Sequence, residues 1–443
     1  MHNKINQFIK NPKKSLIKLA MPIMIGMLVQ IMYNIVDTAF IGRLGAESIA
    51  ALTFSFPIFF ILMAINNGLS IGMSSRISRF LGEKNKKQAE NTAMHGLLWG
   101  LVLGLIVMVL GLILLKPLFL IFGATEVVAS LGINYMSIIL LGVLFMFLSN
   151  IMINIFSAQG NTKVHMKIQI SALVMNMILD PIFIYVLNLG VSGAAIASVI
   201  SFFFALVLVT YDMFTKSLIK LRFSSFKLSK RIIKDIFAVG FPTSISTTLI
   251  SIYIIFINRF SAHFGTEYVA AFGLASRLES VAVMPIMAIS FAMITLVGMF
   301  YGAKKYEILK ETVKYGIKIS VIFTSCMGVV FFFLSKILLR IFTSDELLLS
   351  ISSSYIGIIV VTFPMMAIGF LTSRVMQGMG FGLPGLVINL IRIFFVAVPL
   401  AYVFVFILGY GFLSIAAAMV VGGIVSSFVA SVWLTSKLGR LKV

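Results

Sequence analysis

The chain has 443 residues, of which 60% are hydrophobic and 11% charged, and its mean hydropathy is +1.10. A soluble domain carries about 25% charged residues, so this composition excludes an ordinary soluble protein and predicts a polytopic membrane protein. The net charge is +21, but most Lys and Arg stand in short clusters between apolar runs. We therefore expect the lipid bilayer as its surroundings and no nucleic-acid partner.

The N-terminal segment begins like a signal peptide, with lysines before an apolar run. The run is too long for a signal peptide and no small-residue cleavage site follows, so we expect it to be retained as the first span. The single cysteine, Cys326, excludes an intramolecular disulfide, and the four histidines are scattered without metal-ligand spacing. We expect no resident cofactor.

Twelve apolar spans follow one another along the chain. They run at about 19–42, 48–75, 92–115, 127–158, 168–187, 192–213, 238–262, 267–299, 315–335, 347–373, 383–408 and 411–436. Several exceed the roughly 20 residues that cross a bilayer, so we expect tilted or extended helices. The predicted fold class is an all-α integral membrane protein with twelve transmembrane helices.

The basic residues predict the orientation of these spans. One set of loops and ends holds 27 Lys and Arg, and the opposite set holds four, which are Arg43, Lys116, Lys336 and Arg340. Positive charge concentrates on the cytoplasmic side, so both termini are expected in the cytoplasm of a multi-pass protein of the cell membrane. The longest connection, 214–237, is basic and is expected to rest on anionic headgroups.

The two halves of the chain repeat each other. The segment "GRLGAESIAALTF" matches "AHFGTEYVAAFGL" at an offset of 220, and the same offset pairs Pro22 with Pro242 and Lys84 with Lys304. Later the offset is 218. Six spans per half, both starting from the cytoplasm, predict two six-helix lobes related by a parallel pseudo-two-fold repeat, a design typical of alternating access. We expect an N-terminal lobe at 1–213, a linker at 214–237 and a C-terminal lobe at 238–443.

Three carboxylates lie well inside predicted spans: Asp37, Asp180 and Glu279. A buried carboxylate costs at least a few kcal/mol, so it needs a partner, a proton or a cation. The alternative is an internal hydrogen bond between helices, which is strongest for Glu279 because Arg277 is two residues away. The repeat does not duplicate the two acids of the first half: Asp37 pairs with Ile257, and Asp180 with Val398. That asymmetry favours a functional role.

Asp180 has Asn176 one turn before it and Pro181 directly after it. Proline removes a backbone hydrogen bond, so an amide, a carboxylate and loosened carbonyls are expected to meet here as hard oxygen ligands. They suit a monovalent cation such as Na⁺, or a shared proton. If spans 1 and 5 face each other, Asp37 and Asp180 share a pocket in which both cannot ionise cheaply.

The chain resembles the multidrug and toxic compound extrusion (MATE) family of efflux antiporters. The resemblance rests on "LAMPIMIGMLVQIMYNIVDTAFIGRLG", "SRFLGEKN", "SAQGNTK", "NMILDPIFIY" and "LASRLESVAVMPIMAIS" in this order, together with the six-plus-six repeat. It implies export of cationic or amphipathic organic compounds, driven by inward Na⁺ or H⁺. It also implies an ion site at Asp37, Tyr135, Asn176, Asp180 and Ser198, a bend of span 1 at Pro22, and a second-lobe alternative at Glu279.

Two rival functions differ from this in class. An integral-membrane enzyme would place carboxylates at the water interface, often in sizeable loops, whereas here the loops are short and the deep acids isolated; we expect no enzyme. No Walker-type phosphate loop is present. A flippase or exporter of lipid-linked or other biosynthetic intermediates is the closer rival, with Arg277, Arg374 and Arg392 available for an anionic headgroup. We expect the transporter to work as a monomer.

Overall fold

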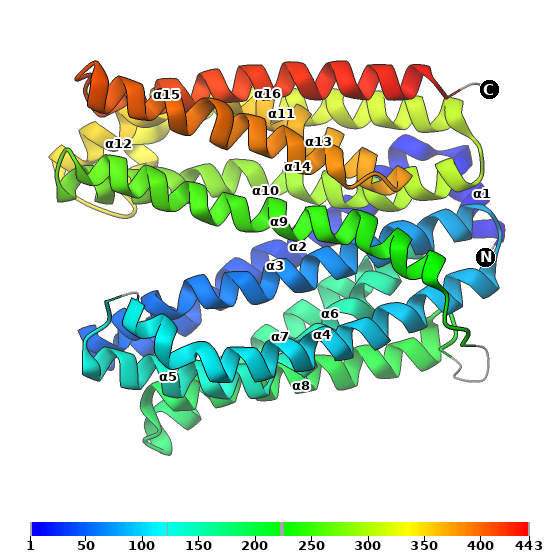
Figure 1. Ribbon diagram of the computed structural model, residues 1–443, viewed down its shortest axis with the longest axis horizontal. Helices are drawn as coiled ribbons and strands as arrows, with labels where there is room; N and C mark the ends of the chain where they lie inside the picture. The colour runs from blue at the N-terminus through cyan, green and yellow to red at the C-terminus, as the bar shows by residue number, and fades with distance from the viewer. Residues whose placement is uncertain (1, 122, 222–225, 442–443) are drawn as a thin grey trace. The chain divides into compact units, whose positions relative to one another are not determined.

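The computed structural model describes residues 2–121, 123–221 and 226–441, and it consists of long helices (Figure 1). Arg222 and Lys442, two of the basic residues used for the orientation, lie outside the described residues. The α-helices are α1 (His2–Lys10), α2 (Pro12–Gly42), α3 (Ala46–Gly82), α4 (Lys86–Ile121), α5 (Glu126–Leu141), α6 (Val143–Ala158), α7 (Lys163–Pro181), α8 (Gly190–Lys216), α9 (Lys230–Ala262), α10 (Thr266–Gly302), α11 (Tyr306–Leu339), α12 (Glu346–Ile359), α13 (Thr362–Met379), α14 (Leu383–Leu390), α15 (Val398–Tyr402) and α16 (Leu413–Gly439). Wider π-helical turns form η1 (Ile182–Val186), η3 (Ile391–Ala397) and η4 (Val403–Ile407).

Ten helical segments in the described part of the chain are long and apolar enough to cross a membrane. Two further spans are bent pairs: α5 and α6 meet at 49°, and α12 and α13 meet at 56°. Counting each pair as one span gives twelve, as predicted. The sequence showed 127–158 and 347–373 as continuous apolar runs, because a bend inside lipid leaves hydropathy unchanged.

The helices are longer than the apolar runs and extend beyond them mainly at the ends rich in Lys and Arg. The third span was predicted at 92–115, whereas α4 covers Lys86–Ile121. Its added first turn carries Lys86 and Glu90, which form an ion pair one turn apart at 3.6 Å. Charged residues of this kind form helix well in water, so hydropathy marks only the part of each helix that lies in lipid.

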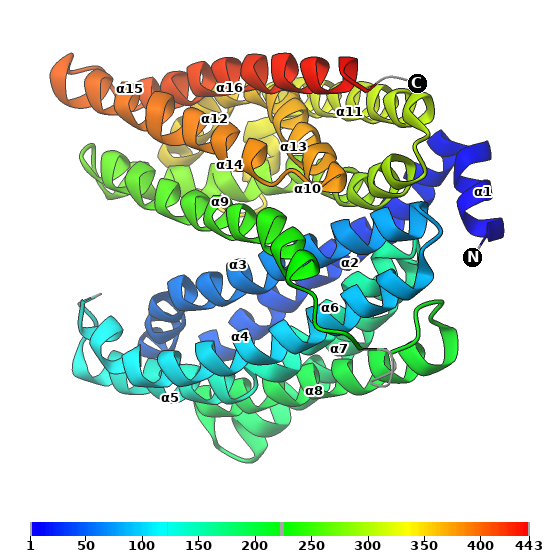
Figure 2. The same ribbon diagram turned by 45° about the vertical axis from the view of Figure 1, so that its right-hand side comes forward.

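The chain divides into two compact units. The first unit contains Met21–Ser244, and the second contains His2–Ala20 and the chain from Ile245 onward. The predicted lobe boundaries at 1–213, 214–237 and 238–443 stay a prediction. In the first unit the helices α3 to α8 pack side by side (Figure 2). Their core is built on Phe119, Met136 and Phe147, none of which is exposed.

Side chains of the first unit hold the backbone of the linker. Asn91 on α4 both donates to and accepts from the backbone of Lys227, at 2.9 and 3.1 Å. The Nε2 atom of His95 accepts from the backbone N–H of Ser229 at 2.9 Å. Gln159, after α6, accepts from the backbone N–H of Leu218 at 2.7 Å. The described residues between α8 and α9 lie outside regular helix, so their backbone groups need such partners.

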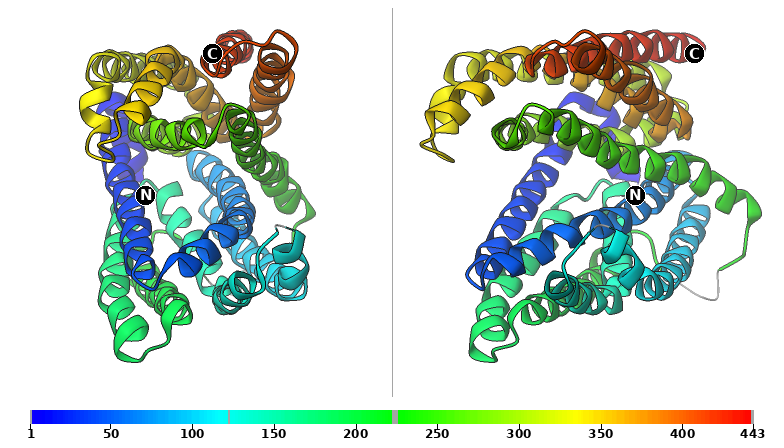
Figure 3. Two further views of the ribbon diagram at one scale, coloured as in Figure 1. Left: turned by 90° about the vertical axis from the view of Figure 1, so that its left-hand side faces the viewer. Right: turned by 60° about the vertical axis from the view of Figure 1, so that its left-hand side comes forward.

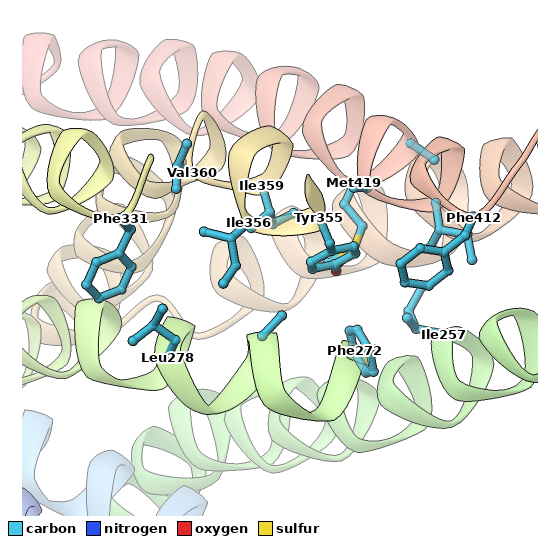
Figure 4. Packing of buried hydrophobic residues seen from close by; sticks show 14 of the residues in the cluster. Ile257, Phe272, Leu278, Phe331, Tyr355, Ile356, Ile359, Val360, Phe412 and Met419 are labelled. Carbon is cyan, nitrogen blue, oxygen red and sulfur yellow. The ribbon is translucent and has the colours of Figure 1, made fainter. Parts of the chain in front are cut away.

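The second unit has an aromatic core. The ring of Tyr355 contacts the rings of both Phe272 and Phe412, and Leu278, Ile356 and Met419 belong to the same cluster (Figure 4). Both chain ends meet the first turns of α11: Lys13 of α2 forms an ion pair with Glu311 at 2.8 Å, and Lys310 donates to the carbonyl of Leu441 at 3.0 Å. Chain ends on one side of this unit agree with an even number of spans.

Backbone conformation and packing both follow the repeat. Gly45 and Gly265 begin α3 and α10 with φ of 116° and 130°, and Lys84 and Lys304 have φ of 58° and 55°. Positive φ is rare for lysine, so its recurrence at an offset of 220 is strong evidence for a repeat. The close packing of Gly96 on Met73 recurs as Gly316 on Met293. The predicted six-plus-six repeat is therefore confirmed.

One close helix contact sets the end of α7. The chain passes through Pro181 into η1 and turns back at Asn188, where φ is 53°. It then returns antiparallel to α7 as α8 (Figure 3). Gly193 of α8 lies against this turn, where an added Cβ would stand 2.5 Å from the carbonyl oxygen of Phe183. Only glycine allows this approach, so α7 and α8 are fixed to each other just beyond Asp180.

We predict that Gly193→Ala lowers the melting temperature of the purified protein by several degrees. The new methyl group meets backbone atoms that cannot rotate away, and overpacking of this kind costs about 1–3 kcal/mol. Gly273→Ala is the matched control, since a Cβ at Gly273 meets nothing within 4 Å. That change should leave stability equal or raise it by about 1 kcal/mol through helix propensity. Equal melting temperatures for both variants would contradict the contact.

Candidate functional site

The three residues that sequence analysis placed in spans 1 and 5 are all buried. Asp37 is 7% exposed, and Asn176 and Asp180 are 0% exposed. The amide of Asn176 donates to the Oδ1 atom of Asp180 at 2.9 Å, one turn along α7. The Oδ1 of Asp37, the Oδ1 of Asn176 and the Oδ2 of Asp180 make no hydrogen bond with any described residue. Three buried acceptor oxygens therefore stand without a donor.

A small apolar cluster explains how helices far apart in sequence bring these groups together. Its buried members are Ile41, Leu52, Ile184, Val191 and Ala194. Ile41 lies one turn after Asp37 on α2, Ile184 lies one turn after Asp180, and Ala194 lies one turn before Ser198 on α8. The cluster holds these three turns against one another. Asp37, Asp180 and Ser198 each lie on the adjacent turn of the same helices, so they are brought close to one another as well.

The electrostatics of the two carboxylates agree with this placement. The charge of Asp37 acts on Asp180, and both charges act on the hydroxyl of Tyr135. Tyr135 belongs to α5 and packs against the same apolar cluster. Asp37, Tyr135, Asn176, Asp180 and Ser198, the five residues expected at one ion site, are thus drawn together from α2, α5, α7 and α8 within the first unit.

Sequence analysis missed Tyr33. Its hydroxyl lies 2.8 Å from the Oγ of Ser198, linking α2 to α8, and the charges of Asp37 and Asp180 both act on it. Tyr33 stands four residues before Asp37, on the same helix face, and this spacing was the available signal. Tyr185 was also missed: its hydroxyl donates to the carbonyl of Phe40 at 2.6 Å and ties η1 to the end of α2.

Pro22 and Pro181 lie in different local backbone structures. α2 continues as one helix through Pro22, which lies two residues from the boundary between the units. Pro181 closes α7, and the helix widens into the π-turn η1 directly after it. A proline leaves the carbonyl one turn before it without its usual donor, and the wide turn accommodates this next to Asp180.

The remaining deep acid, Glu279, belongs to the second unit. It lies on α10 and is half-buried, while Arg277 is exposed. Residues two apart on a helix point in different directions, so the expectation of Arg277 as its partner is not met. The charge that acts on Glu279 is that of Arg392, in η3.

The donor set of the first unit limits what it can bind. Within the described residues there is no group of three or more His, Cys, Asp or Glu that could hold a metal ion. Two carboxylates, an amide and hydroxyls are hard oxygen ligands, which suit a small monovalent cation or protons better than a soft transition metal.

Comparison with known proteins agrees with this architecture. A family model named MatE matches residues 22–182 and again 242–403, so it follows the internal repeat. The Multidrug export protein MepA of Staphylococcus aureus (strain NCTC 8325 / PS 47) is 29% identical over 379 residues, which cover 85% of this chain and 84% of that protein. MepA of Staphylococcus saprophyticus is 28% identical over 372 residues, or 83% of this chain and 82% of its own.

Solved structures extend the likeness over nearly the whole chain. A crystal structure of MATE in the bent conformation has a TM-score of 0.95 at 30% identity and covers 99% of this chain and 98% of its own. A MOP superfamily transporter from Pyrococcus furiosus, whose description concerns a reversed polarity of its binding pocket, has a TM-score of 0.94 at 30% identity with the same coverage. The family match, the repeat and the two-lobe fold together lead to one conclusion: the chain belongs to the MATE family of transporters.

Proposed function

We propose that this protein is a secondary active efflux transporter of the cell membrane. It exports cationic or amphipathic drugs and toxic compounds in exchange for inward Na⁺ or H⁺, by alternating access, with both termini in the cytoplasm. MepA is named as a multidrug exporter, which supports drug-like cargo. The observation that carries the proposal is the pair of buried carboxylates, Asp37 and Asp180, with oxygens that no described residue satisfies.

The chemistry follows from burial. Two carboxylates that act on each other in apolar surroundings repel strongly, because little solvent screens them. A bound Na⁺, or a proton on one acid, removes that repulsion and supplies the missing partner for the free oxygens. The site therefore has two stable states. In one state the acids are charged and held apart, and in the other they are neutralised and closer together. A transporter needs two such states with different ion occupancy to couple an ion to its cargo.

Each residue near the acids has a definite role in this scheme. Asp37 and Asp180 carry the charge that the ion neutralises, and Asn176 holds Asp180 and offers its own Oδ1 as a ligand. Ser198 and Tyr33 link α8 to α2 through their hydroxyls, and Tyr135 packs over the apolar cluster. Pro22 lies on the same helix as Asp37, so a change at the acid acts on a helix already weakened by proline.

The flippase alternative has less support. It depends on arginines available for an anionic headgroup, but Arg374 donates to Gln377 at 2.8 Å and lies over the ring of Phe291 at 4.5 Å. Arg277 lies on an exposed part of α10. Arg392, the third arginine of this alternative, is half-buried in η3 and stays available. The buried acids of the first unit disfavour a phosphate-bearing cargo, because they would repel it.

We predict that Asp37→Asn abolishes gradient-driven efflux while leaving the amount of protein in the membrane unchanged. Asparagine keeps the shape of the side chain but cannot release a proton or neutralise a cation. Ethidium export from proteoliposomes with an imposed Na⁺ gradient, and then an imposed H⁺ gradient, measures this and identifies the coupling ion. Glu47→Gln, at an exposed acid of α3, is the control and should export normally. Full export by the Asn variant would refute the proposal.

A second prediction concerns ion binding without transport. Replacing choline by Na⁺, or lowering the pH, should raise the melting temperature of the purified protein by relieving the repulsion between the acids. Asp180→Asn should remove that gain, and Asn176→Ala should reduce it less, because it deletes a ligand and not a charge. Glu311→Gln, at a half-exposed surface ion pair, should leave it intact. If both site variants keep the full gain, the ion binds elsewhere.

A further inference from the structure

Two side chains of α4 hold the linker just before α9 begins, and one of them is a histidine. Asn91 donates to the carbonyl of Lys227 at 2.9 Å and accepts from its backbone N–H at 3.1 Å. One turn further along α4, the Nε2 atom of His95 lies 2.9 Å from the backbone nitrogen of Ser229. The ring of Phe226 lies 4.9 Å from the His95 ring, measured between centroids. We call the contacts of Asn91 and His95 with Lys227 and Ser229 the linker latch.

The partners of His95 determine which of its ring nitrogens carries a proton. The Nδ1 atom lies 2.8 Å from the carbonyl oxygen of Asn91, which can only accept a hydrogen bond. The backbone N–H of Ser229 can only donate, so Nδ1 carries the proton and Nε2 offers its lone pair. A second proton would sit on Nε2 and face that N–H, and two donors at this distance repel. His95 is 0% exposed, so water does not relieve the conflict. The latch therefore closes around the uncharged ring.

No free carboxylate is available to stabilise a charged His95 in the part of the chain that the structure describes. The other charged residues on α3, α4, α9 and the linker around it are mostly basic, and they include Arg76, Arg79, Lys86, Lys227, Lys230 and Lys234. Of the acids, Asp235 is paired with Arg76 at 3.0 Å, Glu90 accepts from the backbone N–H of Lys220 at 3.1 Å, and Glu83 is exposed at the end of α3. A proton on His95 thus costs a hydrogen bond without gaining an ion pair.

The residue that His95 holds also caps α9. The backbone N–H of Ile232 donates to the Oγ of Ser229 at 3.4 Å, and that of Ile233 donates to its carbonyl at 3.1 Å. Such cap contacts satisfy backbone N–H groups that the first turn of a helix leaves unpaired. Displacing Ser229 therefore loosens the first turn of α9, whereas the bonds of Asn91 involve no titrating group.

The second unit holds the start of α2 with the same two helix positions. Glu311 and Tyr315 of α11 stand at an offset of 220 from Asn91 and His95. Glu311 pairs with Lys13 at 2.8 Å, and the Nζ of Lys13 lies 5.9 Å from the centroid of the Tyr315 ring. The first unit uses a histidine at this position, and histidine is the side chain that ordinarily titrates in mildly acid solution.

We propose that the linker latch is a pH-sensitive contact, which holds Ser229 while His95 is neutral and releases Ser229 and the first turn of α9 when His95 takes up a proton. The latch binds the neutral ring, so its contribution to stability is present at neutral pH and is lost as the pH falls. With the linker in the cytoplasm, as the proposed function has it, the latch responds to cytoplasmic acidity. The release itself depends neither on that orientation nor on the coupling ion.

A nitroxide label beside Ser229 tests the release. Leu228→Cys places the label at a position that is 69% exposed, and Cys326→Ser removes the native thiol. Electron paramagnetic resonance spectra of the full-length protein in nanodiscs are compared at about pH 7.5 and about pH 5.5. The ratio of mobile to restricted label should rise by at least about ten-fold on acidification. It should rise by no more than about a hundred-fold, since one proton acts over two pH units.

Variants assign the response to His95. His95→Gln offers an amide oxygen to Ser229 but does not titrate, so the label should stay restricted at both pH values. Asn91→Ala should make the label more mobile at both and keep the difference between them. His263→Gln, at an exposed histidine, is the matched control and should keep the full response. If His95→Gln is not monodisperse, Ser229→Pro removes the N–H donor and should give a mobile label without a pH response.

A second label separates local release from general loosening. Lys14→Cys places it at an exposed position next to Lys13, and its spectrum should be the same at both pH values. An equal response at this position overturns the proposal. So does a label at Leu228→Cys that ignores pH, or an undiminished response in His95→Gln or Ser229→Pro. The measurement uses no ion gradient or cargo, so its failure leaves the efflux function standing, and a failure of efflux leaves the latch standing.

Discussion

Two carboxylates, Asp37 and Asp180, are buried in apolar surroundings in the first unit, where their charges repel each other. Asp37 and Asp180 each leave an oxygen without a donor, and their charges act on each other. A soluble protein would expose or pair such groups, because each isolated buried charge costs several kcal/mol. Here the surrounding structure holds them in place: the apolar cluster around Ile41 and Ile184, the π-turn after Pro181, and the close approach of Gly193 all fix the turns next to the acids.

The repeat shows that this arrangement is not required by the fold. The two units share their turns down to the positive φ of Lys84 and Lys304, yet the partners of the acids are apolar. Ile257, the counterpart of Asp37, is fully buried in the aromatic core of the second unit, and Val398, the counterpart of Asp180, packs against the same core. Conversely, Glu279 stands where the first unit has Phe59, which packs in the first unit's core. One scaffold therefore carries two different polar interiors, as expected when binding chemistry varies on a constant fold.

Sequence alone predicted the span count, the repeat and the burial of Asp37, Asn176 and Asp180, because lipid imposes a hydropathy pattern and makes deep acids rare. The sequence was insufficient where two different structures produce the same hydropathy pattern. A bend at Gly142 leaves an apolar run unbroken. The charged helix ends that extend into water have the same low hydropathy as loops, so hydropathy does not identify them as helix. Tyr33 is one of 12 tyrosines, and its spacing from Asp37 becomes informative only together with the contact between its hydroxyl and Ser198. The charge that acts on Glu279 belongs to Arg392. Arg392 lies more than 100 positions away in the sequence, so no local spacing predicts this pairing.

Two helices carry the connection between the units, and each is weakened where it passes from one to the other. The unit boundary falls after Ala20 in α2 and after Ser244 in α9, within a few residues of Pro22 and Pro242. Before the boundary each helix is fixed to the unit in which it starts: Lys13 is paired with Glu311 at 2.8 Å, and Asp235 with Arg76 at 3.0 Å. A proline lowers the cost of bending, because one backbone hydrogen bond is already missing. Pro22 is therefore the point at which a bend in α2 costs least before the helix reaches Tyr33 and Asp37.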